Sequence, residues 1–328
     1  MEKKNQSGVI RAVCISMKRG TEKTPIKEGK LVADFGIEQD AHGGNWHRQV
    51  SLLSYDRIKA FNEKGAEVSD GAFGENLVVE GIDFSALAVG TRLSAGEGLL
   101  EITQIGKECH NHCKIYQRMG ECIMPTQGVF AKVIRSGMVR PGDRMEVYGP
   151  DPQRPFTAAV IVLSDKGAAG ERKDESGPAA AEMLKASGYE VVETILLPDE
   201  PEMLKEQLIR LADSRQVDLV VTSGGTGFSL RDQTPEATLA VAHRNVPGIG
   251  EYIRLRSMEI TPRAMLGRGV SVIRGKTLIV NLPGSPRAVK ESLGFILDSL
   301  DHGLKILRGD EGNCGEAPRK SEGRQGEP

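Results

Sequence analysis

Residues with phosphate-binding and metal-binding chemistry follow one short apolar run in the second half of the chain. The run at 217–221 is rich in β-branched residues and leads into 222–227, Thr-Ser-Gly-Gly-Thr-Gly. Glycines let an anion approach the backbone amides, and the hydroxyl groups add donors, so a phosphate is the natural occupant. Asp232 follows beside Arg231, and a carboxylate near a phosphate indicates a metal ion between them. A plain strand-to-helix turn is the structural alternative.

Three other apolar runs are followed by similar groups, and all four are expected to be strands. Ligands bind at the carboxyl ends of the strands of an open parallel sheet, so these groups are expected to meet at one edge. The candidate contact residues at this edge are Ser164, Asp165, Ser176, Gly177, Asp199, Thr222, Gly224, Gly225, Thr226, Gly227, Asp232, Glu251, Pro283, Gly284 and Ser285.

Several of these residues also have a purely structural interpretation. Asp199, three residues before Glu202, fits a variant of the helix capping box, and Ser285 fits an ordinary N-cap before a proline. Residues 174–177 fit a turn, and Glu251 fits either a helix cap or the same edge. The sequence alone leaves these alternatives open.

The elements that must position this edge alternate between strand and helix. Such alternation predicts an α/β domain with a mostly parallel sheet covered by helices. The expected strands are 157–163, 189–197, 217–222 and 277–282, and the expected helices begin near Pro178, Glu200, Pro235 and Pro286. A strand rather than a helix follows Gly275-Lys276, so that pair is not an ATPase-type phosphate loop.

The first half of the chain has a different pattern, with short apolar runs separated by glycines and one clear helix at 55–64. This pattern predicts a β-rich barrel or sandwich. The expected strands are 9–16, 49–54, 76–79, 91–93, 99–105, 129–134 and 144–147. Three prolines at 150–155 indicate a linker between domains at 1–149 and 156–308, and the polar segment 309–328 is expected to be disordered.

Composition narrows the functional classes. The chain has 328 residues, a formal net charge of −2 and a pI near 6.4, which argues against a general nucleic-acid binder or a membrane-surface protein. No apolar run approaches membrane-spanning length, and no signal peptide is recognised near the start. Five widely spaced cysteines fit a reducing environment, so a cytoplasmic location is expected.

The motifs of the second half resemble those of the molybdopterin adenylyltransferases of molybdenum-cofactor synthesis, over about residues 155–308. The matching segments, in the family's order, are 164–165, 174–177, 198–200, 222–227, 231–237, 247–251 and 281–286.

This resemblance implies a three-layer α/β fold, usually trimeric, that transfers AMP from Mg-ATP to the phosphate of molybdopterin. It places the two functional aspartates, which would hold Mg²⁺, on Asp199 and Asp232, and the phosphate loop on 224–227. The attacking phosphate oxygen is already anionic, so the reaction needs charge neutralisation and alignment rather than a strong base. Where the family commonly has Leu-Ser-Arg, residues 266–268 are Leu-Gly-Arg, which removes a hydroxyl that could contact a ligand.

The first half resembles a MOSC domain, a β-rich fold of molybdenum-cofactor sulfurases and related proteins. The matching segments are 42–44, 49–52, 73–77, 87–90 and 139–143. The resemblance places the family's cysteine on Cys113, with His42 as a further candidate, and implies binding of molybdenum cofactor or transfer of sulfur. A metal cluster that includes Cys109, Cys113 and Cys122 is an alternative, although its spacing matches no common zinc pattern.

The leading function is therefore adenylylation of molybdopterin with ATP and Mg²⁺. The protein is expected to be a homo-oligomer, namely a trimer, and other molybdenum-cofactor proteins are expected as partners. A non-catalytic protein that binds or delivers the cofactor is one alternative. Sulfur transfer led by the first domain is the other. Retention of both Asp199 and Asp232 favours the enzyme, because a pure binding protein needs no metal pair.

Overall fold

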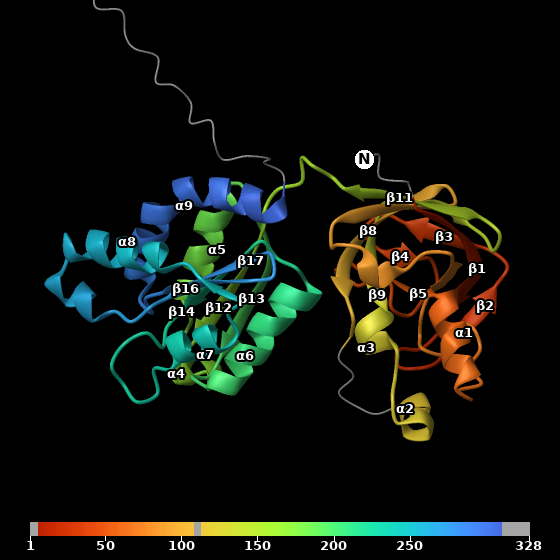
Figure 1. Ribbon diagram of the computed structural model, residues 1–328, viewed down its shortest axis with the longest axis horizontal. Coiled ribbons are helices and arrows are strands. Elements are labelled where there is room, and N and C mark those ends of the chain that lie inside the picture. Colours follow the sequence, from red (N-terminus) through yellow and green to blue (C-terminus); the bar gives the residue numbers. More distant parts are fainter. Residues whose placement is uncertain (1–5, 108–112, 310–328) are drawn as a thin grey trace, which may run out of the picture. The chain divides into compact units, whose positions relative to one another are not determined.

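The computed structural model describes residues 6–107 and 113–309 and contains two compact units (Figure 1). The main division falls between Pro155 and Phe156, and residues 206–217 group with the first unit. The predicted tail lies outside the described residues apart from Gly309, which ends the last helix in a left-handed conformation. Each unit is described separately below as the N-terminal and the C-terminal unit.

The N-terminal unit is a closed barrel of seven strands. The last strand of the sheet pairs with the first, with Ser7 opposite Glu146, and this pairing closes the sheet. Of the two predicted architectures, the unit is therefore the barrel and not the sandwich. Neighbouring strands are antiparallel apart from one parallel pair, β5 with β6. In the order around the barrel, the strands are β1 (Ser7–Ile15), β6 (Leu77–Glu80), β5 (Val50–Ser54), β9 (Val129–Arg135), β8 (Gly98–Ile105), β7 (Thr91–Ala95) and β11 (Arg144–Pro150).

Smaller elements complete this unit, and most of them were not predicted. They are the strands β2 (Thr24–Ile26), β3 (Gly29–Val32), β4 (Gly36–Ile37) and β10 (Gly137–Val139), and the helices α1 (Tyr55–Glu63), η1 (Phe84–Ala86), α2 (Lys114–Met119) and α3 (Met124–Gln127). Strand alternation supplies two apolar clusters: Leu52 joins the larger cluster, and Leu53 joins a second one with Ile58 and Phe61 of α1.

The C-terminal unit is built on a six-stranded sheet in the order β13-β12-β14-β17-β16-β15. The four predicted strands are present and parallel: β12 (Thr157–Leu163), β13 (Glu190–Leu197), β14 (Leu219–Ser223) and β17 (Thr277–Leu282). Two further strands, β15 (Arg244–Asn245) and β16 (Ser271–Arg274), are antiparallel, so the sheet is mixed rather than simply parallel. The cause is local: Gly275-Lys276 forms a two-residue turn between β16 and β17, and such turns join antiparallel strands.

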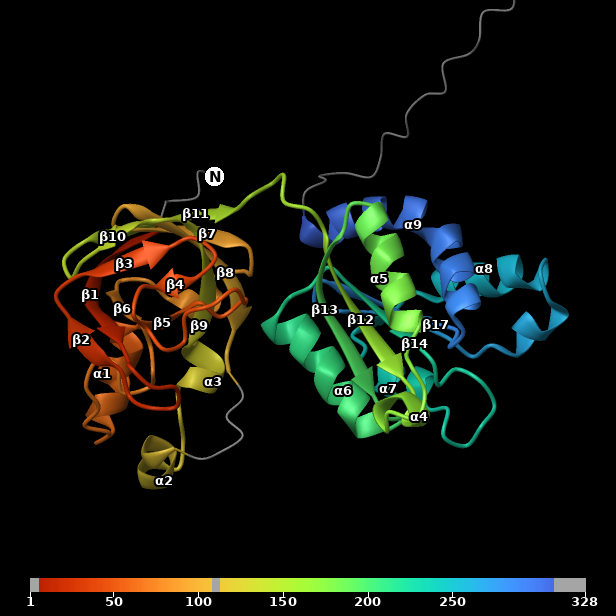
Figure 2. The same ribbon diagram turned by 180° about the vertical axis from the view of Figure 1, so that it is seen from behind.

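Helices cover both faces of this sheet. Figures 1 and 2 show α5, α8 and α9 on one side and α6 and α7 on the other. The first group shares one apolar cluster with β12, β14 and β17, and one face of α9, which includes Val289, Leu293 and Ile296, is buried in it. The helices after residue 156, of which η2 and the end of α6 group with the first unit, are α4 (Asp165–Ala168), α5 (Ser176–Ala186), α6 (Pro201–Ile209), η2 (Arg210–Ser214), α7 (Thr234–Ala240), α8 (Pro247–Met258), η3 (Pro262–Leu266) and α9 (Pro286–Arg308).

Among the helices of the described residues, none combines the length and the apolar character needed to cross a bilayer.

Candidate functional site

The carboxyl ends of the four parallel strands meet at one edge of the C-terminal unit, as the sequence predicts. In the sheet register Leu163 lies opposite Leu197, and Ser223 lies opposite both Val162 and Leu282. Because these strands run in the same direction, the residues that follow each of them emerge side by side. The glycine loop, residues 224–227, therefore lies between the segments that begin at Ser164, Pro198 and Pro283.

Glycines are required in this loop because neighbouring atoms approach the backbone closely. Gly224 has a φ of +103°, and a Cβ atom there would clash with the carbonyl oxygen of Leu163. Gly225 has a φ of +61°, and a Cβ atom there would clash with the hydroxyl group of Thr234. A Cβ atom on Gly284 would come within 3.2 Å of the Gly224 Cα. Glycine is thus required here by the close packing of the loop against the segments on either side of it.

Two carboxylates approach the glycine loop. Oδ1 of Asp199 lies 3.5 Å from the point where a Cβ atom on Gly225 would be. Oδ2 of Asp232 lies 2.8 Å from the point where a Cβ atom on Gly227 would be. Burial raises the pKa of Asp199, and the nearby carboxylates of Asp165 and Asp232 raise it further. The loop therefore brings together acidic groups that repel one another, and a cation would relieve that repulsion.

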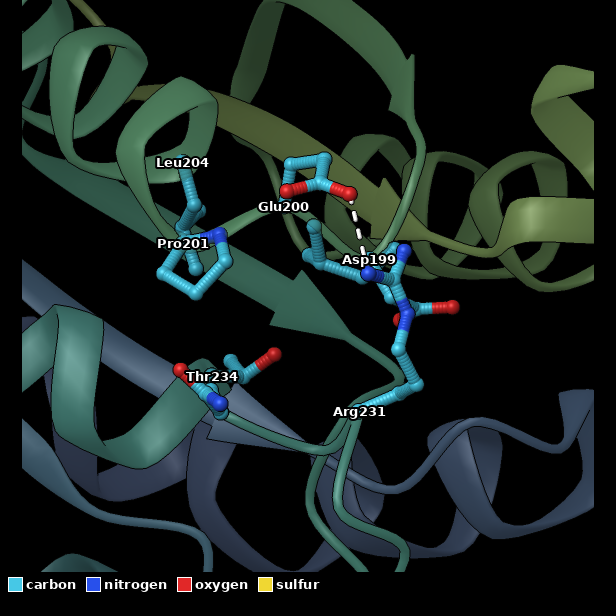
Figure 3. Close-up of a pocket in the computed structure, with 8 residues that line it drawn as sticks. Asp199, Glu200, Pro201, Leu204, Arg231 and Thr234 are labelled. Atoms are coloured by element: carbon cyan, nitrogen blue, oxygen red, sulfur yellow. Dashed lines mark hydrogen bonds and ion pairs between the residues drawn. The ribbon is translucent and has the colours of Figure 1, made fainter.

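Arg231 holds the acidic edge together. Its guanidinium donates two hydrogen bonds to Asp165, at 3.2 and 2.8 Å, and one to Glu200 at 2.9 Å. Figure 3 shows this side chain beside Glu200 and Asp199 in a small pocket that Thr234 also lines. The hydrogen bonds from Arg231 lower the pKa of the exposed Asp165 carboxyl. Sequence reasoning did not include Arg231 among the site residues, although its position next to Asp232 was a usable signal.

Asp165 and Asp199 also bind each other's backbone. The Asp165 N–H donates to Asp199 Oδ2 at 3.0 Å, and the Asp199 N–H donates to Asp165 Oδ1 at 2.9 Å. These reciprocal bonds fix the two segments that follow β12 and β13. The Asp199 carboxylate is thus turned toward the neighbouring strand end.

A second arginine supports the glycine loop. The backbone N–H of Arg268 donates to the Thr226 carbonyl at 3.0 Å, and its Nε donates to the Gly227 carbonyl at 2.7 Å. Its terminal nitrogens contact the Asp232 carbonyl and Glu236. Arg268 therefore restrains the end of the loop and the backbone of Asp232. This role follows from a long-range contact that sequence spacing does not indicate.

The hydroxyl groups of several predicted contact residues already accept hydrogen bonds within the protein. The Thr222 hydroxyl is buried and accepts from the Asn281 amide at 2.9 Å. The Ser164 hydroxyl accepts from the Gly167 N–H at 3.1 Å, within the short helix α4. The Ser285 hydroxyl accepts from the Ala288 N–H at 3.2 Å and caps α9.

The remaining predicted residues lie at helix starts. Asp174 accepts hydrogen bonds from the backbone N–H groups of Ser176 and Gly177, at 2.9 and 3.1 Å, and so opens α5. Glu251 is an exposed residue of α8 and does not line the pocket around Asp199. Pro283 accepts from the Ser223 hydroxyl at 3.0 Å, which fixes the turn before Gly284.

The residues at the loop fit a magnesium ion with an incomplete protein shell. Asp199 and Asp232 supply hard oxygen donors, the kind that Mg²⁺ prefers. Within residues 6–107 and 113–309, no group of three or more His, Cys, Asp and Glu side chains forms a metal site. Mg²⁺ commonly binds through one or two carboxylates and completes its shell with water and substrate phosphates, which suits this arrangement.

The cysteines of the N-terminal unit differ in their exposure. Cys113 is exposed and precedes α2, and its carbonyl accepts from the Gln117 N–H at 2.9 Å. Cys14 is buried in β1, and burial raises its pKa to about 12. Cys109 and its neighbouring histidines, the core of the alternative metal cluster, lie outside the described residues. Cys113 is therefore the more accessible thiol of these two.

Comparison with known proteins divides the chain in the same way. The family described as a probable molybdopterin binding domain matches residues 159–302, and the MOSC domain family matches residues 38–146. The chain is 43% identical over 143 residues to the molybdopterin adenylyltransferase of Escherichia coli K12, covering 43% of this chain and 73% of that protein. It is 38% identical over 153 residues to the molybdopterin adenylyltransferase of Helicobacter pylori 26695, covering 46% and 87%.

Among solved structures, the molybdopterin biosynthesis enzyme MoaB from Thermus thermophilus is 46% identical, with a TM-score of 0.45. The match covers 47% of this chain and 97% of that one.

Proposed function

Because this chain belongs to the molybdopterin adenylyltransferase family through its C-terminal unit and also carries a MOSC domain, we propose that it adenylylates molybdopterin at the glycine loop, using Mg-ATP. The observation that carries this proposal is the approach of two carboxylates, from Asp199 and Asp232, to the positions that Cβ atoms would occupy on Gly225 and Gly227. That arrangement suits a polyphosphate and its metal ion.

The reaction transfers the AMP group of ATP. An oxygen of the molybdopterin phosphate forms a bond with the α-phosphorus, the bond from that phosphorus to the bridging oxygen breaks, and pyrophosphate leaves. When bound, Mg²⁺ would neutralise phosphate charge, and Asp199 and Asp232 are the residues that would hold it.

The other residues of the site position these two carboxylates and the phosphates. Backbone N–H groups of the glycine loop would bind the polyphosphate, and Gly224 and Gly225 hold the loop in a conformation that other residues rarely adopt. Arg268 restrains the loop through the carbonyls of Thr226 and Gly227. Arg231 offers a fixed positive charge at the edge, a suitable partner for developing charge on the departing pyrophosphate.

The direct test incubates the protein with molybdopterin, ATP and Mg²⁺ and measures pyrophosphate and adenylylated pterin. Asp232→Asn is expected to lower turnover by on the order of 10²-fold or more, the scale for loss of one electrostatic contact to the transition state. The amide oxygen can still accept the Ser229 N–H, which Asp232 Oδ2 accepts at 3.0 Å, so the fold should be retained.

Asp298→Asn, at an exposed position on α9, is the matched control and should leave turnover unchanged. Unchanged turnover and Mg²⁺ dependence in Asp232→Asn would contradict the proposed role of Asp232. A large loss of thermal stability would instead support its interpretation as a turn residue. Binding of molybdopterin without turnover in the unsubstituted protein would favour a delivery function.

For the N-terminal unit we propose handling of the molybdenum cofactor or of sulfur through Cys113, because its thiol is free and exposed. We also propose a reducing, cytoplasmic location, because five widely spaced cysteines do not fit a disulfide framework.

We further propose that the protein assembles as a trimer through the C-terminal unit. Apolar side chains, including Ile249, Tyr252 and Ile306, line a groove of about 490 Å³ between α8 and α9. Such a surface is typical of a region that another chain covers. Measurement of the solution mass tests the assembly.

A further inference from the structure

The N-terminal unit contains a buried ion pair that the proposed chemistry does not use. Nζ of Lys23 lies 2.5 Å from Oδ2 of Asp40, and the two side chains are 1% and 0% exposed. Asp40 also accepts from the backbone N–H of Ser16 at 2.9 Å and from the Asn76 amide at 3.2 Å. A buried ion pair adds little stability compared with apolar residues of the same volume, so we expect this pair to have a role other than stabilisation.

His42 contacts this pair through one ring nitrogen. Its Nδ1 lies 3.4 Å from the Lys23 ammonium and 3.9 Å from the Asp40 carboxylate. An ammonium group only donates, so Nδ1 must accept, and the proton of the neutral ring is then on Nε2. Burial lowers the pKa of His42, and the positive charge of Lys23 lowers it further, so the ring stays neutral near pH 7.

This tautomer makes His42 a hydrogen-bond donor rather than a metal ligand. Nδ1 faces the ammonium, and Nε2 carries a proton where a metal would need a lone pair. The ring is partly open, with 28% of the side chain exposed. The Trp46 indole donates to the His42 carbonyl at 2.9 Å and so helps to fix the backbone of this residue.

The charges that act on the ring are mainly positive. Arg19 donates from Nε to the carbonyl of Ala41 at 3.0 Å, which anchors its guanidinium beside the residue before His42. Lys107 and Arg19 both act electrostatically on the imidazole. The acidic group that acts on it is Asp40, which Lys23 already neutralises. A neutral N–H donor with cationic neighbours is suited to an anion.

We propose that His42 and Arg19 form an oxyanion site in the N-terminal unit, and that the buried Lys23–Asp40 pair sets the tautomer of His42 for this purpose. The ligand class is a tetrahedral dianion, either free or as the phosphomonoester end of a larger molecule. This site is separate from the glycine loop and does not depend on the adenylylation proposed above.

The test observes the His42 ring directly in the full chain, by NMR of the ¹⁵N-labelled histidines. The His42 signals are assigned as those lost in His42→Gln. We expect a neutral ring protonated at Nε2 at pH 7 and a saturable change of the Nε2 shift when inorganic phosphate or molybdate is added. Since the readout is at His42, phosphate bound at the glycine loop does not interfere.

Removal of the Arg19 charge tests the role of the exposed cation. Arg19→Gln is expected to weaken binding by on the order of 10-fold, the scale of one hydrogen bond or contact to a charged group. Lys27→Gln removes an exposed lysine of the same unit and should leave the affinity unchanged. Both variants should retain adenylylation, so a failure of this site is distinguishable from a failure of the proposed enzyme activity.

The choice of probe separates the two sources of the dianion. Tighter binding of inorganic phosphate or molybdate than of glycerol phosphate would identify a site for a free oxyanion. Tighter binding of glycerol phosphate would identify a site for a phosphomonoester. A ring protonated at Nδ1, or no change at His42 with any probe at about 10 mM, would overturn the proposal. An equal loss of affinity in Lys27→Gln would overturn it as well, since binding would then follow net charge alone.

Discussion

At the scale of single residues, the C-terminal edge places two neighbouring aspartates in opposite environments. Asp165 is exposed and paired with Arg231, which lowers its pKa. Asp199 is partly buried, and burial together with the carboxylates of Asp165 and Asp232 raises its pKa. Asp165 is therefore stabilised as a carboxylate by the protein itself. Asp199 depends on a further cation, which fits the proposed role in holding Mg²⁺.

The raised pKa of Asp199 has a consequence for stability. A group whose pKa is higher in the folded state stabilises the protein below its unfolded pKa, and this contribution is lost as the pH rises through the folded value. At neutral pH the Asp199 carboxylate therefore opposes folding. Asp199→Asn removes that charge, and its amide oxygen can still accept the Asp165 N–H.

We expect Asp199→Asn to unfold at the same temperature as the unsubstituted protein or higher at pH 7, and to lose on the order of 10²-fold or more in turnover. Thermal unfolding at pH 4 and pH 7, without Mg²⁺, measures the first effect. The increase in unfolding temperature relative to the unsubstituted protein should be larger at pH 7 than at pH 4. A lower unfolding temperature at pH 7 would show that Asp199 is needed as a structural cap.

The sequence predicted best those residues whose chemistry follows from local spacing. The glycines of the loop and the two aspartates near it were recognisable because each follows a short apolar run. Arg268 and the Lys23–Asp40 pair were not, since their partners lie far away in the sequence. The Thr222 hydroxyl also has a distant partner, since it accepts a hydrogen bond from the Asn281 amide on the neighbouring strand.

At the scale of elements, one buried ion pair ties the end of α9 to the sheet. Arg308 donates to both oxygens of Asp218, each at 2.7 Å, and Asp218 also accepts the backbone N–H of Thr157 at 2.8 Å. The Arg308 guanidinium lies 4.1 Å from the centre of the Phe156 ring. This contact joins the start of β12, the residue before β14 and the last turn of α9.

Arg308→Ala should destabilise the C-terminal unit strongly, by about 3–5 kcal/mol, because it leaves the buried Asp218 carboxylate without its cation. Arg287→Ala on the same helix is the matched control. Arg287 pairs with Glu291 at 2.7 Å but its side chain is 80% exposed, so its loss should leave the free energy of unfolding nearly unchanged. Denaturant unfolding compares the two variants. Similar losses in the free energy of unfolding would show that the Arg308–Asp218 ion pair contributes no more than an ion pair at the surface.

Element prediction succeeded where the apolar period was clear. The four parallel strands and the long helix α9 lie close to their predicted positions. Helix α8 was missed because Gly248 and Gly250 occupy its first turn, and glycine is a poor helix former. The strands β15 and β16 are only two and four residues long, too short for a periodic signal.

At the scale of the whole molecule, each unit has its own apolar core. The barrel encloses one cluster and packs a second beneath α1, and the C-terminal sheet forms another with α5, α8 and α9. Only residues 151–156 lie between β11 and β12. A tether this short raises the effective concentration of one site near the other without requiring a fixed interface. We therefore expect the fusion to favour transfer of an intermediate between the units.

Cleavage of the chain after Pro152 tests this division of labour. We expect the C-terminal fragment to stay oligomeric and to adenylylate molybdopterin with unchanged turnover, because the glycine loop and both aspartates belong to that unit. Solution mass and pyrophosphate release measure the two properties. A monomeric or unfolded fragment would contradict the proposed independence of the units. Cys113→Ser in the intact chain provides the complementary test: if every cofactor-dependent output is unchanged, the thiol has no part in cofactor or sulfur handling, and the N-terminal unit contributes binding alone.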